Sequence, residues 1–152
     1  ETYSPTAGMS RGQFSAMLVR ALNIETNNEP QFDDTKEHYF AKELQTLVDA
    51  GVLEGDGKSL MPDATITRYQ SALMLERLLK HLEVELPEVS IGELAFTDID
   101  DLPESTKQSL ALMQKLEIFV GKGNGQFDPY AELTRSEMSK VIVKALTYAG
   151  MM

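Results

Sequence analysis

Apolar residues recur with a helical spacing after each of three arginines in the chain. The third, sixth, seventh, tenth and eleventh residues after each arginine are apolar, with Ser71 as the single exception. Positions with this spacing share one face of an α-helix. The pattern predicts three amphipathic helices that begin near residues 11, 68 and 135. Their apolar stripes are Phe14, Met17, Leu18, Ala21 and Leu22; Ser71, Met74, Leu75, Leu78 and Leu79; and Met138, Val141, Ile142, Ala145 and Leu146.

A capping signal supports each of these three helix starts. A hydroxyl residue stands directly before the arginine, and a Gln or Glu follows the hydroxyl residue by three positions, in the pairs Ser10 and Gln13, Thr67 and Gln70, and Thr134 and Glu137. In such a box the two side chains satisfy backbone N–H groups that the first turn of a helix leaves free. The three arginines are therefore expected to occupy the first helical positions.

The stretches around the arginines form an internal repeat. Each arginine follows a proline by six residues, and a large apolar residue stands two before the proline: Tyr3, Leu60 and Phe127. The second and third copies are preceded by a further amphipathic pattern and a glycine-rich turn, with the apolar residues Phe40, Leu44, Leu47 and Val48 and Leu110, Met113 and Leu116. We therefore expect an all-α fold of tandem helix-loop-helix repeats with short glycine-rich loops. The repeats are 1–25 (second half only), 30–83 and 94–150, within a single module spanning 1–152.

The composition argues against several classes of function. A net charge of −10 argues against general affinity for nucleic acid, which needs a basic face. The chain has no cysteine, and its two histidines, His38 and His81, belong to no recognisable metal or nucleophile arrangement. No apolar run approaches the length of a membrane span. We expect a non-enzymatic protein with no cofactor, no metal and no membrane insertion, although its many carboxylates leave a polysaccharide-cleaving enzyme open as an alternative.

The charge at the helix starts is unusual. Arg11, Arg68 and Arg135 stand where the helix dipole disfavours a cation by about 0.3–1 kcal/mol, so stability alone favours Asp or Glu there. A helix start also offers free N–H groups to an anion, and a guanidinium can clamp a carboxylate with two hydrogen bonds. We hypothesise that these arginines bind an anionic ligand. The open alternative is that they cover neighbouring helices or pair with acidic residues.

Together these motifs resemble the S-layer homology domain. The shared elements are a Phe-x-Asp opening at Phe32 and Phe96, an amphipathic helix, a glycine turn, an aromatic-x-Pro step, and the helix start seen in Thr134-Arg135-Ser136-Glu137. The resemblance implies three repeats around a pseudo-threefold helical core and a location outside the cell, on the bacterial surface. It also implies non-covalent anchoring to the cell wall through an anionic secondary wall polysaccharide, pyruvylated in many members. The family's ligand arginine falls on Arg11, Arg68 and Arg135.

Two further points stay open. Asp34 and Asp98 are candidate sugar ligands, but an Asp just ahead of a helix is more often a cap or turn former. The first repeat lacks its opening half in this sequence, which favours a second hypothesis of protein–protein assembly, with self-association through the incomplete repeat.

Overall fold

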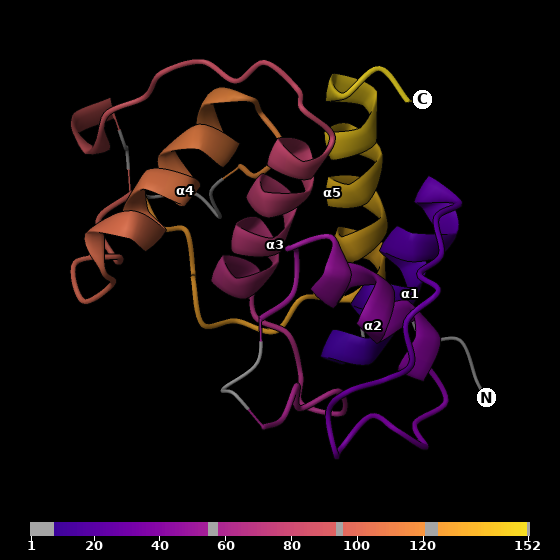
Figure 1. Ribbon diagram of the computed structural model, residues 1–152. Helices are drawn as coiled ribbons and strands as arrows, with labels where there is room; N and C mark the ends of the chain where they lie inside the picture. Colours follow the sequence, from indigo (N-terminus) through magenta and orange to yellow (C-terminus); the bar gives the residue numbers. More distant parts are fainter. Residues whose placement is uncertain (1–7, 55–57, 94–95, 121–124, 152) are drawn as a thin grey trace.

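The computed structural model describes residues 8–54, 58–93, 96–120 and 125–151, which form five α-helices joined by long loops (Figure 1). The elements are α1 (Arg11–Leu22), α2 (Ala41–Asp49), α3 (Arg68–His81), the 3-10 turn η1 (Ile91–Glu93), α4 (Glu104–Lys115) and α5 (Arg135–Tyr148). Apart from isolated antiparallel bridges, these described residues contain no β-structure. The predicted all-α class is confirmed.

The three predicted helix starts are confirmed, and each carries a complete capping box. In α1 the Ser10 hydroxyl accepts the Gln13 N–H at 3.1 Å, and the Gln13 side-chain oxygen accepts the Ser10 N–H at 2.8 Å. The same reciprocal pair forms at α3 and α5. Because the box satisfies N–H groups at the first turn, it sets where each helix begins.

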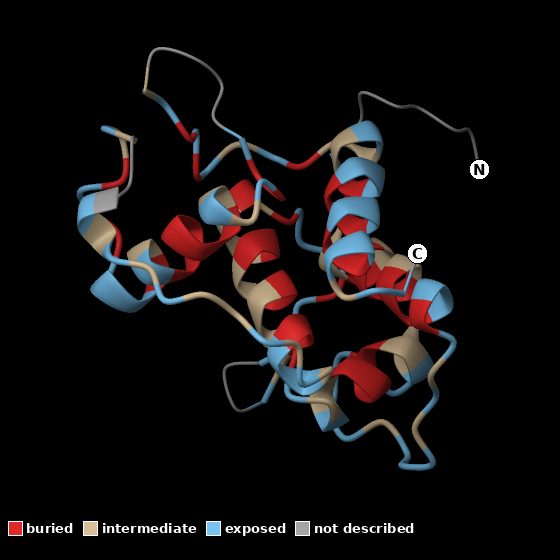
Figure 2. Cartoon of the chain, turned by 90° about the horizontal axis from the view of Figure 1, so that it is seen from above, coloured by how far each residue is buried: buried red, intermediate tan, exposed pale blue. Residues whose placement is uncertain are grey.

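The helices pack in pairs that join neighbouring repeats. Helix α1 packs on α2 and α3 packs on α4, while α5 lies beside α3 (Figure 1). Their apolar faces point inward and form the core (Figure 2). The predicted stripes are buried with two exceptions in α1: Met17 is half-buried and Ala21 is exposed. Ser71 is fully buried despite its polarity, because its hydroxyl donates to the Arg68 carbonyl at 2.8 Å.

A closed ring of backbone hydrogen bonds joins the segments that lead into α1, α3 and α5. Met9 N–H donates to the Leu133 carbonyl at 3.0 Å, Leu133 N–H to the Ile66 carbonyl at 3.0 Å, and Ile66 N–H to the Met9 carbonyl at 2.8 Å. All three side chains are buried. Each segment donates to one neighbour and accepts from the other, so the three arginine-bearing helix starts are gathered at one end of the molecule.

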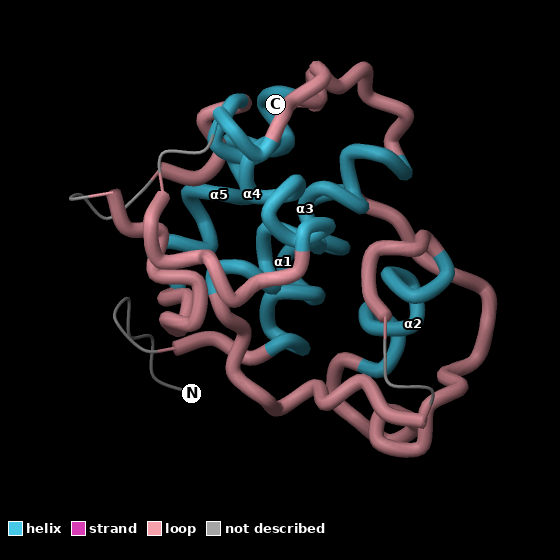
Figure 3. The backbone as a smooth tube through the Cα atoms, turned by 90° about the vertical axis from the view of Figure 1, so that its left-hand side faces the viewer, coloured by secondary structure: helices cyan, strands magenta, loops and turns pink. Residues whose placement is uncertain are grey.

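The loops run along the outside of the helices and are tied to them (Figure 3). In the stretch 25–31, Thr26 and Asn28 donate to the Asp49 carboxylate, and Gln31 N–H donates to the Gln45 side chain at 3.1 Å. Gly51 and Gly125 have φ of 77° and 74°, as expected for turn glycines. The other glycines of the two predicted turns lie outside the described residues. The repeat boundaries stay a prediction.

Candidate functional site

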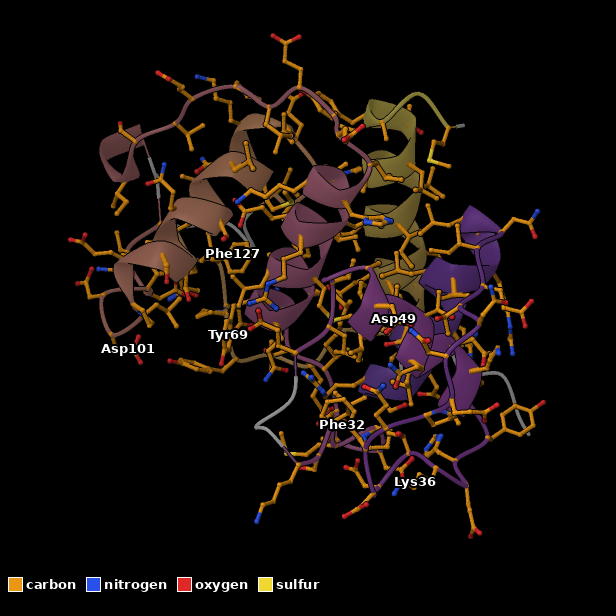
Figure 4. The ribbon with its side chains drawn as sticks, viewed as in Figure 1. Phe32, Lys36, Asp49, Tyr69, Asp101 and Phe127 are labelled. Carbon is orange, nitrogen blue, oxygen red and sulfur yellow. The ribbon has the colours of Figure 1, made fainter. Side chains whose placement is uncertain are left out.

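Arg68 is the most enclosed of the three arginines. Its Nε donates to the Phe127 carbonyl at 2.9 Å, its Nη2 to the Val120 carbonyl at 2.9 Å, and its Nη1 to the Glu137 carboxylate at 3.3 Å. The side chain is 6% exposed. The guanidinium carbon lies 4.9 Å from the centre of the Phe127 ring, which stands beside the base of α3 (Figure 4). The first turn of α3 is thereby fixed to the loops of the third repeat.

The electrostatic surroundings of Arg68 have opposing effects. Burial lowers the pKa of Arg68 from its ordinary value, while the nearby carboxylates of Glu137, Asp128 and Asp98 act in the opposite direction. The guanidinium nevertheless remains charged, because arginine does not lose its proton in proteins. Arg68 thus places a permanent positive charge in a largely enclosed position.

Arg11 makes the corresponding contacts with the second repeat. Its Nε donates to the Leu60 carbonyl at 2.9 Å, and its Nη2 to the Glu54 carbonyl at 3.3 Å. Burial, and secondarily the charge of Arg77, lowers the pKa of Arg11. The residue of the first repeat that matches Leu60 and Phe127 is Tyr3, which lies outside the described residues. Arg135 is half-buried at the start of α5.

These contacts supply a structural reason for the positive charge at the helix starts. The guanidinium groups of Arg11 and Arg68 reach away from their own helices and donate to backbone carbonyls of the next repeat. A carbonyl withdrawn from water needs a donor, and arginine offers five N–H groups in one planar head. Neither of the two interpretations drawn from the sequence included the contact with backbone carbonyls, whereas the ion pair of Arg68 with Glu137 agrees with the alternative that the arginines pair with acidic residues. Ligand binding by the three arginines stays a prediction.

Asp34 and Asp98 hold equivalent loops in place. The Asp34 carboxylate accepts the N–H groups of Leu60 and Met61, at 3.1 and 2.8 Å. The Asp98 carboxylate accepts those of Phe127 and Asp128, at 2.9 and 2.8 Å. Met61 and Asp128 both have left-handed φ, 51° and 61°. The carboxylates therefore stabilise strained turns, which is the structural role considered for them, and their role as sugar ligands stays a prediction.

The Asp98 contact predicts a measurable loss of stability. Changing Asp98 to Asn removes the charge and one acceptor oxygen, so one loop N–H loses its partner, and we expect a loss of about 1–2 kcal/mol in the free energy of unfolding. Urea denaturation followed by circular dichroism measures it. Asp100→Asn, an exposed neighbour, is the matched control and should change little. Equal stability of both variants would contradict the role of Asp98 in holding this loop.

A cleft of about 180 Å³ lies beside Arg68, and we refer to it as the Arg68 cleft. One face of α5 lines it together with residues 118–120. The lining residues are Arg68, Ile118, Phe119, Val120, Glu137, Lys140, Val141 and Lys144. Ile118 and Phe119 are buried and apolar, whereas Lys140 and Lys144 are exposed. The cleft therefore combines an apolar floor with a basic rim.

The two lysines differ from the cations that occupy the position of Lys144 in the other repeats. The ion pairs that the described residues form involve other basic side chains, including Arg20 with Glu43 at 3.2 Å and Arg77 with Glu54 at 3.4 Å. Neither Lys140 nor Lys144 takes part in any of them. Within that part of the chain, Lys140 and Lys144 line the cleft and are exposed to solvent without a carboxylate partner.

Two other clefts offer less to an anion. One, of about 240 Å³, is lined by Arg135, Arg20, Gln13, Tyr39 and Phe40, and we refer to it as the Arg135 cleft. Its Arg20 is already paired with the Glu43 carboxylate at 3.2 Å. Another, of about 410 Å³, lies between the end of α1 and α2 and contains two acidic side chains beside its two basic ones. We therefore take the Arg68 cleft as the candidate site for an anion.

Lys140 and Lys144 were missed in the sequence analysis. The signal for Lys144 was present, because a basic residue follows each of the three arginines by nine positions: Arg20, Arg77 and Lys144. Nine residues is two and a half helical turns, so this periodicity alone does not place the two cations together. They share the cleft because Arg68 belongs to α3 and Lys144 to the neighbouring helix α5.

Two features are absent from the described ranges, a membrane-spanning helix and a cluster of metal-ligating side chains. None of their helices is long and apolar enough to cross a membrane. Nor do His, Asp and Glu side chains gather there in groups of three or more suited to a metal ion.

Comparison with known proteins identifies the family. The S-layer homology domain model matches residues 31–70 and 95–139, more than half of the chain. The chain is 31% identical to the amylopullulanase of Thermoanaerobacterium thermosulfurigenes over 97% of its length, and 30% identical to S-layer protein EA1 of Bacillus anthracis over 93%. It is also 31% identical to an S-layer protein of Bacillus licheniformis over 93%.

The matches cover only a small part of each relative. The chain spans 8% of the length of the amylopullulanase and 16% of each of the two S-layer proteins. The shared part is a non-catalytic binding module that serves in cell-surface anchoring, which confirms the expected location outside the cell, at the bacterial surface. The chain belongs to the S-layer homology domain family.

Proposed function

We propose that this module fastens a surface protein to the cell wall by binding an anionic wall polysaccharide in the Arg68 cleft. The observation that carries the proposal is the charge of the cleft. Among the described residues, Arg68, Lys140 and Lys144 line it with Glu137 as the one acidic side chain, in a chain whose net charge is −10. Locally gathered cations give an anion a binding site that the overall charge of the chain does not.

The shape and chemistry of the cleft suit an acidic sugar. Lys140 and Lys144 donate charge-assisted hydrogen bonds to a carboxylate at the rim. Arg68 stands behind them with its donors engaged, and contributes a fixed positive charge rather than a direct clamp. Phe119 and Ile118 offer an apolar surface to a sugar ring or methyl group. A pyruvate ketal carries both a carboxylate and a methyl group on one carbon, so it matches both parts of the cleft.

The test compares one polymer with and without its acidic group. Secondary wall polysaccharide that carries pyruvate ketals is titrated into the protein, beside the same polymer after mild-acid removal of the ketals. We expect binding to the ketal-bearing polymer, weakening as salt rises, and at least a tenfold loss when the ketal is removed. Equal affinity for both polymers, or for neither, would overturn the carboxylate mechanism.

Protein–protein assembly is the second candidate function. It is favoured by the outer side of α5, where Val143, Tyr148 and the following Met151 are 47%, 39% and 46% exposed. In α1 the matching position to Val143 is Val19, which is 7% exposed beneath α2. Sedimentation over a range of concentrations separates the two functions, since a monomer that binds polymer supports anchoring alone.

A further inference from the structure

Arg11 and Arg68 are set in the same framework. Each Nε donates to the carbonyl two residues before a proline, Leu60 or Phe127, at 2.9 Å. Each Nη2 donates to a second carbonyl of the same loop, that of Glu54 at 3.3 Å or of Val120 at 2.9 Å. Glu54 and Val120 therefore hold equivalent places beside the two arginines, and their side chains can be compared directly.

The two places differ in charge. Glu54 extends its carboxylate to Arg77, 3.4 Å from Nη2, and Arg77 matches Lys144 in the repeat. We refer to Arg11, Glu54 and Arg77 as the Arg11 cluster. Val120 is exposed but has no charge, so nothing from that position neutralises Lys144. In the Arg135 cleft, Arg20 is the matching cation, and Glu43 of α2 pairs with it at 3.2 Å.

The Arg11 cluster is thus a self-neutralised counterpart of the Arg68 cleft. Two arginines lie close enough for Arg77 to lower the pKa of Arg11, and one carboxylate of the chain itself, that of Glu54, is paired with Arg77. Leu73 stands where the Arg68 cleft has Lys140. A ligand carboxylate approaching Arg77 has to displace Glu54 and is repelled by it. At Arg68 the same approach meets two lysines, a neutral valine and one carboxylate, that of Glu137, which is paired with Arg68 at 3.3 Å and not with either lysine.

We propose that the charge of the side chain at positions 54 and 120 determines whether the Arg11 cluster and the Arg68 cleft bind an acidic sugar. Glu54 prevents such binding at the Arg11 cluster. This inference rests on the proposed function, because it concerns how the same chemistry is distributed among the repeats. The chain then binds one acidic sugar with useful affinity, at the Arg68 cleft. Glu54 is a specificity-determining residue that acts through its charge.

Reciprocal substitutions test the inference, because both side chains are exposed and neither belongs to the core. The probe is the methyl glycoside of a hexosamine with a pyruvate ketal across O4 and O6, titrated by calorimetry. Wild type should bind one molecule per chain. Val120→Glu should weaken that binding at least tenfold, and Glu54→Val should add a second, weaker binding event. The glycoside without the ketal is the control, and Glu54→Gln tests whether removal of the charge suffices.

Each outcome has a definite meaning. Binding that falls with Val120→Glu and gains a second event with Glu54→Val or Glu54→Gln supports the inference. Ketal-dependent binding by wild type that none of the three substitutions changes overturns the role of Glu54 and leaves the proposed function standing. Absence of any ketal-dependent binding by wild type, to the glycoside and to the whole polymer, overturns the proposed function and this inference together.

Discussion

Replacing Lys140 and Lys144 together with Gln is expected to weaken binding of the ketal-bearing polysaccharide about 30- to 150-fold. Each lysine is exposed at the rim of the Arg68 cleft, so a contact with a ligand carboxylate contributes about 1–1.5 kcal/mol to binding after screening by solvent. Two such contacts give about 2–3 kcal/mol, and about 1.4 kcal/mol corresponds to a tenfold change in affinity. Calorimetric titration of wild type and variant measures the difference.

The chain offers a control of equal charge. Lys36→Gln with Lys80→Gln also removes two positive charges, but these lysines are exposed, lie outside the Arg68 cleft, and pair with Asp33 and with the half-buried Glu76. Such pairs add little to stability, so both double variants should unfold at nearly the same denaturant concentration as wild type. If the control pair weakens binding as much as the cleft pair, attraction by overall charge explains the affinity and the Arg68 cleft has no special part.

Replacing Arg68 with Met is expected to lower the free energy of unfolding by about 2–4 kcal/mol. The methionine fills much of the volume between Phe119 and Phe127, yet it cannot donate to the carbonyls of Phe127 and Val120 or pair with Glu137. Acceptors that lose a buried donor, and a carboxylate that loses its partner, account for a loss of this size. Urea denaturation followed by helical circular dichroism measures it.

Two companion variants separate charge from geometry. Arg68→Lys keeps the charge but has no planar head to reach two carbonyls, so it should recover less than half of the lost stability. Arg11→Met breaks contacts that are more exposed, one of them at 3.3 Å, and should cost about 1–2 kcal/mol. Full recovery by lysine would show that the positive charge alone matters. No loss in Arg68→Met would show that the carbonyl contacts add nothing to stability.

These expectations change how binding should be tested. Removing Arg11, Arg68 and Arg135 together would loosen the loops that shape the clefts, so lost binding in that variant would have two explanations. The lysines avoid the difficulty, because within the described residues they form no ion pair that mutation would break. Binding is therefore better tested at the rim than at the arginines.

The sequence by itself determined where the arginine-bearing helices begin and which faces they bury. Both are local matters: a capping box acts within four residues, and an apolar stripe depends on the period of a single helix. The starts at Arg11, Arg68 and Arg135 and the buried stripes of α3 and α5 were therefore predictable. The family was predictable too, because it rests on the order and spacing of such local motifs.

Only the tertiary structure decided what the arginines touch and where the cations gather. Arg68 donates to the Phe127 carbonyl, 59 residues away in the sequence, and to the Val120 carbonyl, 52 residues away. A sequence pattern within one helix does not predict contacts between residues so far apart. Lys140 and Lys144 become neighbours of Arg68 because the hydrogen-bonded ring of Met9, Ile66 and Leu133 sets three helix starts side by side. Contacts between repeats depend on how the repeats are joined, and sequence spacing describes each repeat separately.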